Sequence, residues 1–135
     1  MLKLSKKSEY ALMAMRYLAM SSDGKYATAR DISQYYDIPY ELVAKVLQQL
    51  VKKNLVSSLQ GVRGGYSLVR APEQISLMEI ISAIEDNYQI TNCMNENSSQ
   101  KDCSHFECCM IRDPLIKVQR EIDKVFQNMK IIQII

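Results

Sequence analysis

Residues 28–53 read TARDISQYYDIPYELVAKVLQQLVKK, and this segment is the most informative about the architecture of the chain. Thr28 is followed three residues later by Asp31, a pairing that resembles a capping box and predicts a short helix ending near Tyr36. Pro39 then predicts the opening of a second helix, which runs to the end of the stretch. Two helices joined by a tight turn are typical of a helix-turn-helix.

The second helix has two faces of opposite character. Its apolar side chains recur at helical spacing, at Leu42, Val43, Val46, Leu47 and Leu50. The other face carries long hydrogen-bonding side chains, Glu41, Lys45, Gln48, Gln49 and Lys52. In the major groove Gln pairs with adenine edges, Lys pairs with guanine, and Glu accepts from cytosine. We therefore expect the polar face to read DNA.

The residues after this helix predict a β-hairpin. Two β-prone runs, residues 55–59 and 66–69, flank the Gly-rich tip at residues 60–65. After a helix-turn-helix such a hairpin is a wing, and Arg63 at its tip is free to enter a groove or to grip a phosphate. We expect the DNA contacts to be Thr28, Tyr40, Glu41, Lys45, Gln48, Gln49, Gln60, Arg63, Gly64 and Gly65.

Further helices flank the motif. Residues 5–21 have the apolar spacing of a helix with one buried face. Residues 76–79 form a capping box that opens a helix to about Glu85. Asp113 as N-cap and Pro114 at the first position predict a last helix. Its apolar side chains form a heptad seam at Leu115, Val118, Ile122, Val125, Met129 and Ile132.

This seam predicts a homodimer through the last helix, since two copies are needed to span two half-sites of an operator. The fold class is therefore mainly α with a small β-hairpin wing: a winged helix-turn-helix plus a long C-terminal dimerisation helix. We assign residues 1–86 to the DNA-binding domain, 87–111 to a cysteine-containing cluster-binding loop, and 112–135 to the dimerisation helix and tail.

Charge divides the chain into two halves. Residues 1–70 hold eleven Lys and Arg against five Asp and Glu, and residues 71–135 hold six against ten. The basic half suits phosphates, although an unevenly charged solvated surface would look the same. No run of about 18 apolar residues predicts a membrane span, and charges in residues 1–10 do not suit a signal peptide, so we expect a cytoplasmic protein. We find no nucleophile–base pair, phosphate loop or paired carboxylates in the sequence, and we therefore predict that the protein is not an enzyme.

All four cysteines lie in one segment, Cys93-x9-Cys103-x4-Cys108-Cys109. Thiols clustered in a reducing compartment more often bind metal or sense redox than form structural disulfides, and thiolates suit zinc and iron–sulfur clusters. The spacing is not that of a zinc ribbon. Two adjacent cysteines rarely both ligate one metal, which indicates three thiolates and a missing fourth ligand that His105 could supply. Redox-active or merely reduced thiols without a metal are the alternative.

Several stretches together resemble the IscR/NsrR-type iron–sulfur winged-helix repressors, over nearly the whole chain. The resemblance is carried by Leu4-Ser5-x-x-x-Glu9-Tyr10-Ala11-Leu12, by Leu55-Val56-Ser57-Ser58-x-x-Gly61-x-Arg63-Gly64-Gly65-Tyr66, by Ile75-Ser76-Leu77-x-Glu79-Ile80-Ile81-x-Ala83-Ile84-Glu85, and by three cysteines before Arg112. The branch associated with regulating the SUF cluster-assembly system looks most similar, because it shares a long first gap and a Cys-x5-Cys-x2-Arg ending.

That ending, matched onto this chain, implies the ligands Cys93, Cys103 and Cys109, with Cys108 spare. In the family the fourth ligand is either a histidine three residues after the last cysteine or an N-terminal acidic residue of the other subunit. The first position is Arg112 here, which cannot ligate, and the second matches Glu9. The resemblance therefore favours Glu9 over His105, and a 2Fe-2S cluster over a 4Fe-4S cluster.

The resemblance implies a cluster-dependent, DNA-binding transcription repressor that senses iron or cluster supply, redox state or nitric oxide. Cluster-assembly genes are its candidate targets, and its partners are a double-stranded DNA operator and a second copy of the chain. One departure is Ala44, at a helix position where some members carry a glutamate that tunes site choice, so operator preference does not transfer. The alternative is a zinc-binding or cluster-free thiol-redox winged-helix protein.

Overall fold

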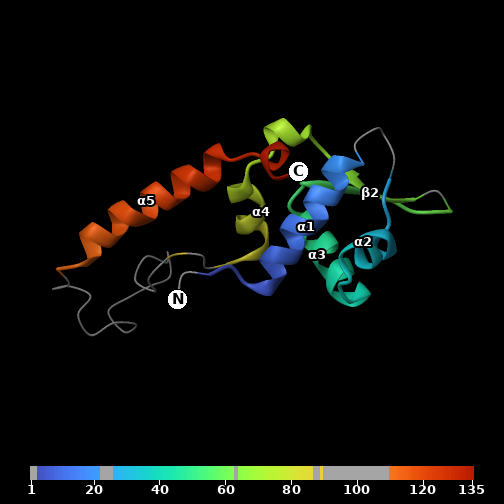
Figure 1. Ribbon diagram of the computed structural model, residues 1–135, viewed down its shortest axis with the longest axis horizontal. Coiled ribbons are helices and arrows are strands. Elements are labelled where there is room, and N and C mark those ends of the chain that lie inside the picture. The colour runs from blue at the N-terminus through green and yellow to red at the C-terminus, as the bar shows by residue number, and fades with distance from the viewer. Residues whose placement is uncertain (1–2, 22–25, 63, 87–88, 90–109) are drawn as a thin grey trace.

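The computed structural model of the chain describes residues 3–21, 26–62, 64–86, 89 and 110–135. Its elements follow in the order α1 (Lys6–Met20), α2 (Ala29–Tyr36), α3 (Tyr40–Lys52), β1 (Val56–Leu59), β2 (Gly65–Leu68), η1 (Pro72–Gln74), α4 (Leu77–Ile84), α5 (Arg112–Asn128) and η3 (Ile131–Ile134). Figure 1 shows α1 to α4 gathered in one body, with α5 projecting from it on the side away from the hairpin. The predicted fold class is confirmed.

The predicted helix starts are largely confirmed by their caps. Thr28 and Asp31 form a full capping box at α2, in which the Thr28 N–H donates to the Asp31 carboxylate at 2.9 Å and the Asp31 N–H donates to the Thr28 hydroxyl at 3.1 Å. Ser76 and Glu79 form the same box at α4. Pro39 is the N-cap of α3 and not a residue of its first turn, because its ψ of 131° is extended.

The core lies between α1, α3 and α4, with α2 and the chain that follows α5 packed on its edges. The apolar face predicted for α3 is buried, apart from the half-buried Leu42. The largest fully buried side chains are Met15, Ile32, Leu47, Leu50, Ile75, Ile80, Ile81 and Ile131. Among the described residues no helix combines the length and the apolar character of a membrane span.

The hairpin pairs β1 and β2 antiparallel, in a register from Val56↔Leu68 to Leu59↔Gly65. Ala27 extends it, since the Ala27 N–H donates to the Tyr66 carbonyl at 2.9 Å and the Tyr66 N–H donates back at 2.7 Å. A Cβ on Gly65, whose φ is 144°, would lie 2.6 Å from the Ala27 carbonyl oxygen. This glycine is therefore required by close backbone packing within the fold.

Helix α5 differs from its prediction at both ends. It begins at Arg112 with Ile111 as N-cap, so Asp113 and Pro114 lie inside the first turn. The first N–H groups of a helix have no partner within it, so proline is tolerated there. The helix ends at Asn128, which leaves the last two seam residues, Met129 and Ile132, outside it.

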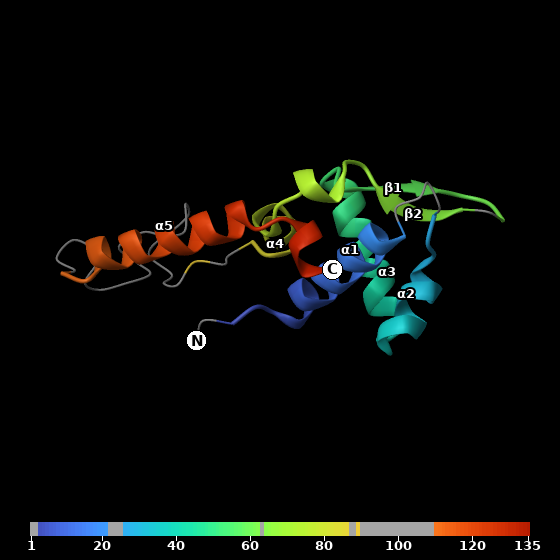
Figure 2. The ribbon, with the colours of Figure 1, turned by 45° about the horizontal axis from the view of Figure 1, so that its top comes forward.

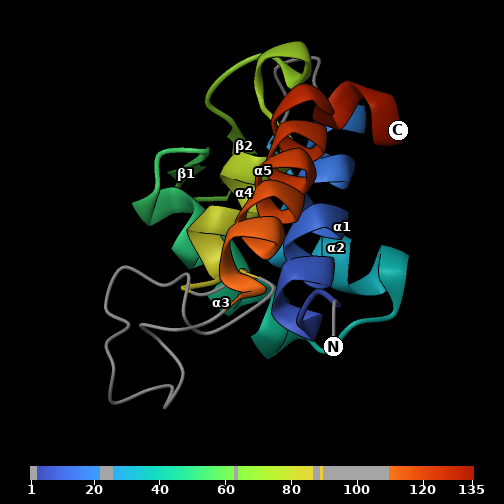
Figure 3. The same ribbon diagram turned by 90° about the vertical axis from the view of Figure 1, so that its left-hand side faces the viewer.

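The early end of α5 has a physical cause in the chain before α4. The Leu77 N–H donates to the Met129 carbonyl at 2.9 Å, and the Ile131 N–H donates to the Ile75 carbonyl at 3.0 Å. These bonds hold Met129 and Lys130 extended beside residues 75–77, and Ile131, which begins η3, is completely buried. Figure 3, viewed from the α5 side, shows α5 in front of α4.

Candidate nucleic-acid interface

Helix α3 presents a polar face to solvent because its apolar face is held in the core. Glu41, Lys45 and Gln48 recur at spacings of four and three residues and are all exposed, and Tyr40 at the start of the helix is 53% exposed. Gln49 is half-buried and lies at the edge of this face. The structure thus places four of the five side chains predicted on α3 where an outside partner can reach them.

Thr28 lies at the start of α2 and is exposed, but it is already engaged. Its hydroxyl oxygen accepts the Asp31 N–H, and the Asp31 carboxylate accepts the Thr28 N–H. A carboxylate therefore already satisfies a backbone donor at this helix end, where an anion would otherwise bind. Only the hydroxyl proton of Thr28 remains to donate to a phosphate.

The hairpin extends from the body on the side opposite α5, as Figures 1 and 2 both show. Gln60 and Val62 near its tip are exposed, whereas Gly64 and Gly65 are half-buried. A Cβ on Gly64 would lie 2.0 Å from the Leu59 carbonyl oxygen, so the packing of the hairpin itself requires a glycine at this position. Arg63 lies outside the described residues.

Exposed cations continue beyond the predicted set. Lys52 and Lys53 lie at the C-terminal end of α3, and Arg30 lies in the first turn of α2. These are candidate phosphate contacts, since Lys and Arg neutralise the DNA backbone. The helical spacing predicted Lys52 on the polar face, but the excess of basic residues did not single out Lys53 or Arg30, because it does not say which side chains share a surface.

The predicted cluster ligands Cys93, Cys103 and Cys109, the spare Cys108 and the alternative His105 lie outside the described residues. Within the described residues no three His, Cys, Asp or Glu side chains gather into a metal site. Glu9 is the one predicted ligand that the structure describes. Its side chain is 41% exposed, and its carboxylate accepts the Lys6 ammonium at 2.9 Å, which raises the pKa of Lys6.

Glu85, the C-cap of α4, fastens the end of this helix to the start of α1. Its Oε1 accepts the Ser5 N–H at 2.9 Å and the Ser8 hydroxyl at 2.8 Å. Burial raises the pKa of Glu85, but the hydrogen bonds from Ser5 and Ser8 outweigh burial and leave the pKa lowered. The chain is therefore anchored next to Glu9 just before residues 87–109. Sequence reasoning missed this role, since it used Glu85 to mark a helix end and as part of a family motif.

Helix α5 leaves apolar side chains exposed. Figure 1 shows that only the C-terminal end of α5 comes close to α4. Val118 is 46% exposed and Val125 is 58% exposed, and both belong to the predicted seam. Ile111 and Met110 before the helix are exposed as well. An apolar stripe of this kind fits a surface that a partner covers.

Comparison with known proteins agrees with this geometry. The model of the Rrf2 family, described as an iron-dependent transcriptional regulator, matches residues 4–135. An HTH-type transcriptional regulator of Aquifex aeolicus is 31% identical over 121 residues, which cover 88% of this chain and 81% of the relative. The regulator NsrR of Halalkalibacterium halodurans is 29% identical over 98 residues, 73% of this chain and 67% of the relative.

Solved structures show the same fold. CymR, the global cysteine regulator of B. subtilis, superposes with a TM-score of 0.77 at 23% identity, over 97% of this chain and 94% of that chain. The structure of T. potens IscR gives a TM-score of 0.73 at 23% identity, over 98% and 85%. The predicted resemblance is confirmed. The prediction that the protein is not an enzyme is confirmed as well, because the family and the relatives cited above are transcription regulators. The chain belongs to the Rrf2 family of transcriptional regulators.

Proposed function

We propose that this regulator is an iron–sulfur-dependent repressor that binds operator DNA as a homodimer. The observation that carries the DNA-binding part is the polar face of α3, exposed on a helix whose other face is fixed in the core. A helix held in this way can enter a major groove without rearrangement of the fold. The excess of basic residues in residues 1–70 supplies attraction to phosphates.

The residues of this interface divide by task. Glu41, Lys45 and Gln48 read base edges, with Gln49 and Tyr40 at the margin of the same face. The hairpin lies beside a groove. The contacts that we propose for the hairpin and for α2 are Thr28, Gln60, Arg63, Gly64 and Gly65.

The second copy of the chain joins through α5. Exposed valines at positions 118 and 125 lie seven residues apart on one side of the helix, the spacing with which two helices pack along each other. A dimer built on α5 carries two recognition helices, as an operator with two half-sites requires.

The cluster is held by thiolates of Cys93, Cys103 and Cys109 and by Glu9 of the partner subunit, with Cys108 spare and His105 as the alternative ligand. Three soft thiolates fit iron–sulfur chemistry, and the family's description as iron-dependent supports it. Glu9 is available, because among the described residues its carboxylate is engaged by an exposed ion pair with Lys6 alone. The cluster that we propose for these ligands is 2Fe-2S rather than 4Fe-4S. When bound, it would make DNA binding respond to iron supply, oxidants or nitric oxide.

The residues that transmit this response are those around α1. Glu85 ties the chain that leads into the cysteine segment to Ser5 and Ser8, next to Glu9. A change at the cysteines therefore acts on α1, which packs against α3 and α4. Only a ligand that favours one of two conformations can shift DNA affinity, so the cluster stabilises one dimer geometry. We place the protein in the cytoplasm, with cluster-assembly genes as candidate targets.

Anaerobic purification followed by visible absorption and Mössbauer spectroscopy tests the cluster. We expect a coloured protein whose colour is lost in Cys93→Ala, in Cys103→Ala and in Cys109→Ala. Cys108→Ala is the matched control and keeps the colour. A colourless Cys108→Ala protein would show that the ligand register is wrong. Colourless wild-type protein with one zinc per chain would overturn the iron–sulfur proposal and leave a zinc-binding regulator.

A second candidate is a cluster-free regulator whose thiols are themselves oxidised. The observation that favours it is a structural neighbour, CymR of Staphylococcus aureus, recorded in an oxidized form with a TM-score of 0.73 at 22% identity. Metal analysis separates the two proposals. Anaerobic protein without iron or zinc, whose DNA affinity changes on addition of peroxide, would favour the second.

A further inference from the structure

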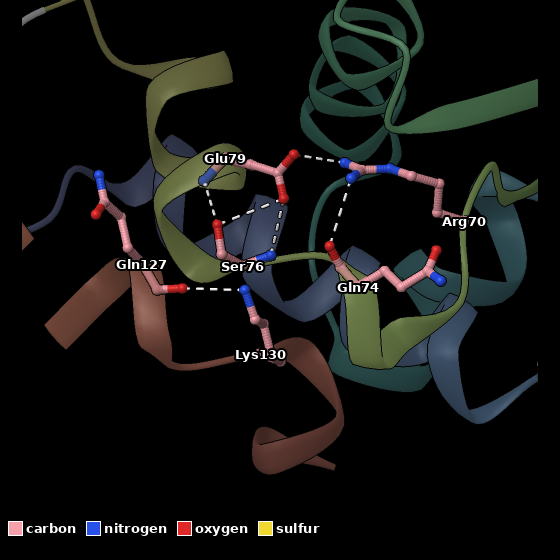
Figure 4. A network of polar contacts seen from close by, with 6 residues as sticks. All are labelled: Arg70, Gln74, Ser76, Glu79, Gln127 and Lys130. Atoms are coloured by element: carbon pink, nitrogen blue, oxygen red, sulfur yellow. Dashed lines mark hydrogen bonds and ion pairs between the residues drawn. The ribbon is translucent and has the colours of Figure 1, made fainter. Parts of the chain in front are cut away.

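Glu79 in the first turn of α4 shares its carboxylate between two parts of the chain, as Figure 4 shows. Its Oε2 accepts the Ser76 N–H at 3.0 Å, which completes the helix cap. Its Oε1 accepts the guanidinium of Arg70. Burial raises the pKa of Glu79, but these donors outweigh burial and leave it lowered, so the carboxylate is ionised at neutral pH.

Arg70 connects this carboxylate to the wing. It follows the end of β2 by two residues, and the Val69 N–H between them donates to the Leu55 carbonyl at 3.2 Å. A second guanidinium nitrogen donates to the Gln74 carbonyl at 3.4 Å. The chain that leaves the wing is therefore held at three neighbouring points.

Ser76, on the other side of the carboxylate, connects to the base of α5. It forms a β-bridge with Lys130, and hydrogen bonds from Leu77 and Ile131 flank the bridge on either side. Ile75 and Ile131 on either side of the bridge are fully buried. The Lys130 ammonium donates to the Gln127 carbonyl at 3.1 Å and so caps the end of α5 (Figure 4). The base of α5 is thus fixed against the start of α4.

We propose that Arg70 and Glu79 form a positioning pair that fixes the wing relative to α5, and thereby relative to the wing of the second copy on an operator. The argument rests on the proposed function, in which α5 joins the dimer. The pair joins the wing exit to Ser76, the middle one of the three residues (75–77) that pair with the base of α5. Rigid placement before binding avoids an ordering cost at the moment of binding.

Two simpler roles are open to the same residues. Glu79 could serve only as a helix cap, and Arg70 could contact a phosphate directly. Glu79→Gln distinguishes the helix-cap role from the pairing with Arg70, because a glutamine at this position can still complete a capping box but carries no charge to pair with Arg70. The second role predicts that Arg70→Gln lowers the salt dependence of DNA binding, by about one unit of slope for each lost phosphate contact.

The experiment uses the full-length chain and a duplex that the wild-type protein enriches from a random pool, with two derivatives whose half-sites lie one base pair closer or farther apart. Glu79→Gln, Arg70→Gln and the double variant are compared with wild type. Glu73→Gln is the matched control, an exposed carboxylate of the same segment. Affinity is measured over a range of salt concentrations, with thermal unfolding and molar mass alongside.

We expect both single variants to bind the enriched duplex about fivefold more weakly, and the double variant no more weakly than either. We also expect reduced discrimination between spacings, an unchanged salt slope and an unchanged molar mass. A Glu79→Gln protein that binds and discriminates like wild type would overturn the pair, as would a lower salt slope confined to Arg70→Gln. The binding and mass of wild type test the proposed function, whereas the ratio of variant to wild type tests this inference.

Discussion

Helices α3 and α5 are both amphipathic in sequence, yet the structure treats their apolar faces in opposite ways. In α3, Val43, Leu47 and Leu50 are at most 1% exposed. In α5, Val118 and Val125 remain about half exposed, at 46% and 58%. Periodicity therefore identifies an apolar face but does not say whether the same chain or another one covers it.

The buried residue of α5 sharpens this contrast. Gln119 is 6% exposed and donates to Asp123 at 2.8 Å, whereas the valine before it faces solvent. The covered side of α5 thus includes only part of the predicted seam, since Leu115 and Ile122 are half-buried whereas Val118 and Val125 are exposed. Residues of α3 pack against α1 and α4, but α5 packs against α4 at one end. Packing in the core determines which face of α3 is buried. We propose that a second copy of the chain covers the exposed valines of α5.

The largest effect is expected from polar substitution of the exposed stripe. Val118→Glu combined with Val125→Glu places four carboxylates in the dimer seam, and we expect a molar mass of one chain by light scattering. DNA affinity should fall by about 100-fold or more, since two linked half-site contacts become one. Thermal stability of the body should be unchanged, because neither valine lies in the core.

Lys117→Glu combined with Lys124→Glu is the matched control. It introduces the same side chain one position earlier on the same helix, at two exposed sites with the same seven-residue spacing. It changes the charge by more than the valine variant does. Monomers in this control, or dimers in the valine variant, would break the contrast between α3 and α5.

The next effect concerns the face that is covered within the chain. Leu47→Ala in α3 removes a fully buried side chain and should lower the free energy of unfolding by about 2–5 kcal/mol. Leu59→Ala makes the same chemical change at a side chain that is 49% exposed, and should cost less than about 0.5 kcal/mol. Urea titration of both variants gives the comparison. Equal losses would show that α3 is not the helix that the core fixes.

A smaller effect tests the outward face of α3. Lys45→Ala should weaken binding to the enriched duplex about tenfold, the loss expected of one good base contact. Lys7→Ala removes another exposed lysine, near the start of α1, and is expected to leave the affinity unchanged. Fluorescence anisotropy at one fixed salt concentration measures both. The same loss in both variants would indicate a general charge effect in place of recognition by α3.

The elements that local signals define could be predicted from sequence, and those that depend on distant partners could not. The capping boxes at Thr28 and Ser76 and the apolar spacing of α3 are local, and each predicted its element. The prediction that the last helix continues to Ile132 was wrong, because pairing between residues 75–77 and 129–131 ends it at Asn128, and this pairing joins residues far apart in sequence. Glu79 and Glu85 were predicted as a capping residue and a helix end, and their contacts to Arg70, Ser5 and Ser8 were not foreseen.

The candidate site follows the same division. The exposed positions on α3 follow from the helical period once the buried face is known. The tip glycines were expected to allow close backbone approach, but their partners, the Leu59 and Ala27 carbonyls, could not be foreseen, because they depend on contacts in the folded chain. The same holds for the half-buried Gln49. The cysteines remain a prediction from spacing and resemblance.

The smallest predicted effect concerns Glu85, which anchors the body to the chain that precedes the cysteine segment. Because its pKa is lowered in the folded state, its hydrogen bonds stabilise the fold above the unfolded value of about 4.3, and this stability is lost as pH falls through the folded pKa. Glu85→Gln should therefore be less stable than wild type at pH 7 and at pH 5, by less than about 1 kcal/mol because the carboxylate is partly exposed. The difference should shrink below about pH 4.3.

Thermal unfolding at a series of pH values measures this difference, with Glu73→Gln as a control that should follow wild type throughout. A constant gap between Glu85→Gln and wild type down to pH 3 would mean that shape, and not the charge that Ser5 and Ser8 bind, holds α4 to α1. A gap that closes with acid would instead locate the boundary between the two regions at a single carboxylate. The charge of Glu85 would then hold the end of α4 to the start of α1, whereas the base of α5 is held separately, by the pairing around Ser76 and by the burial of Ile131.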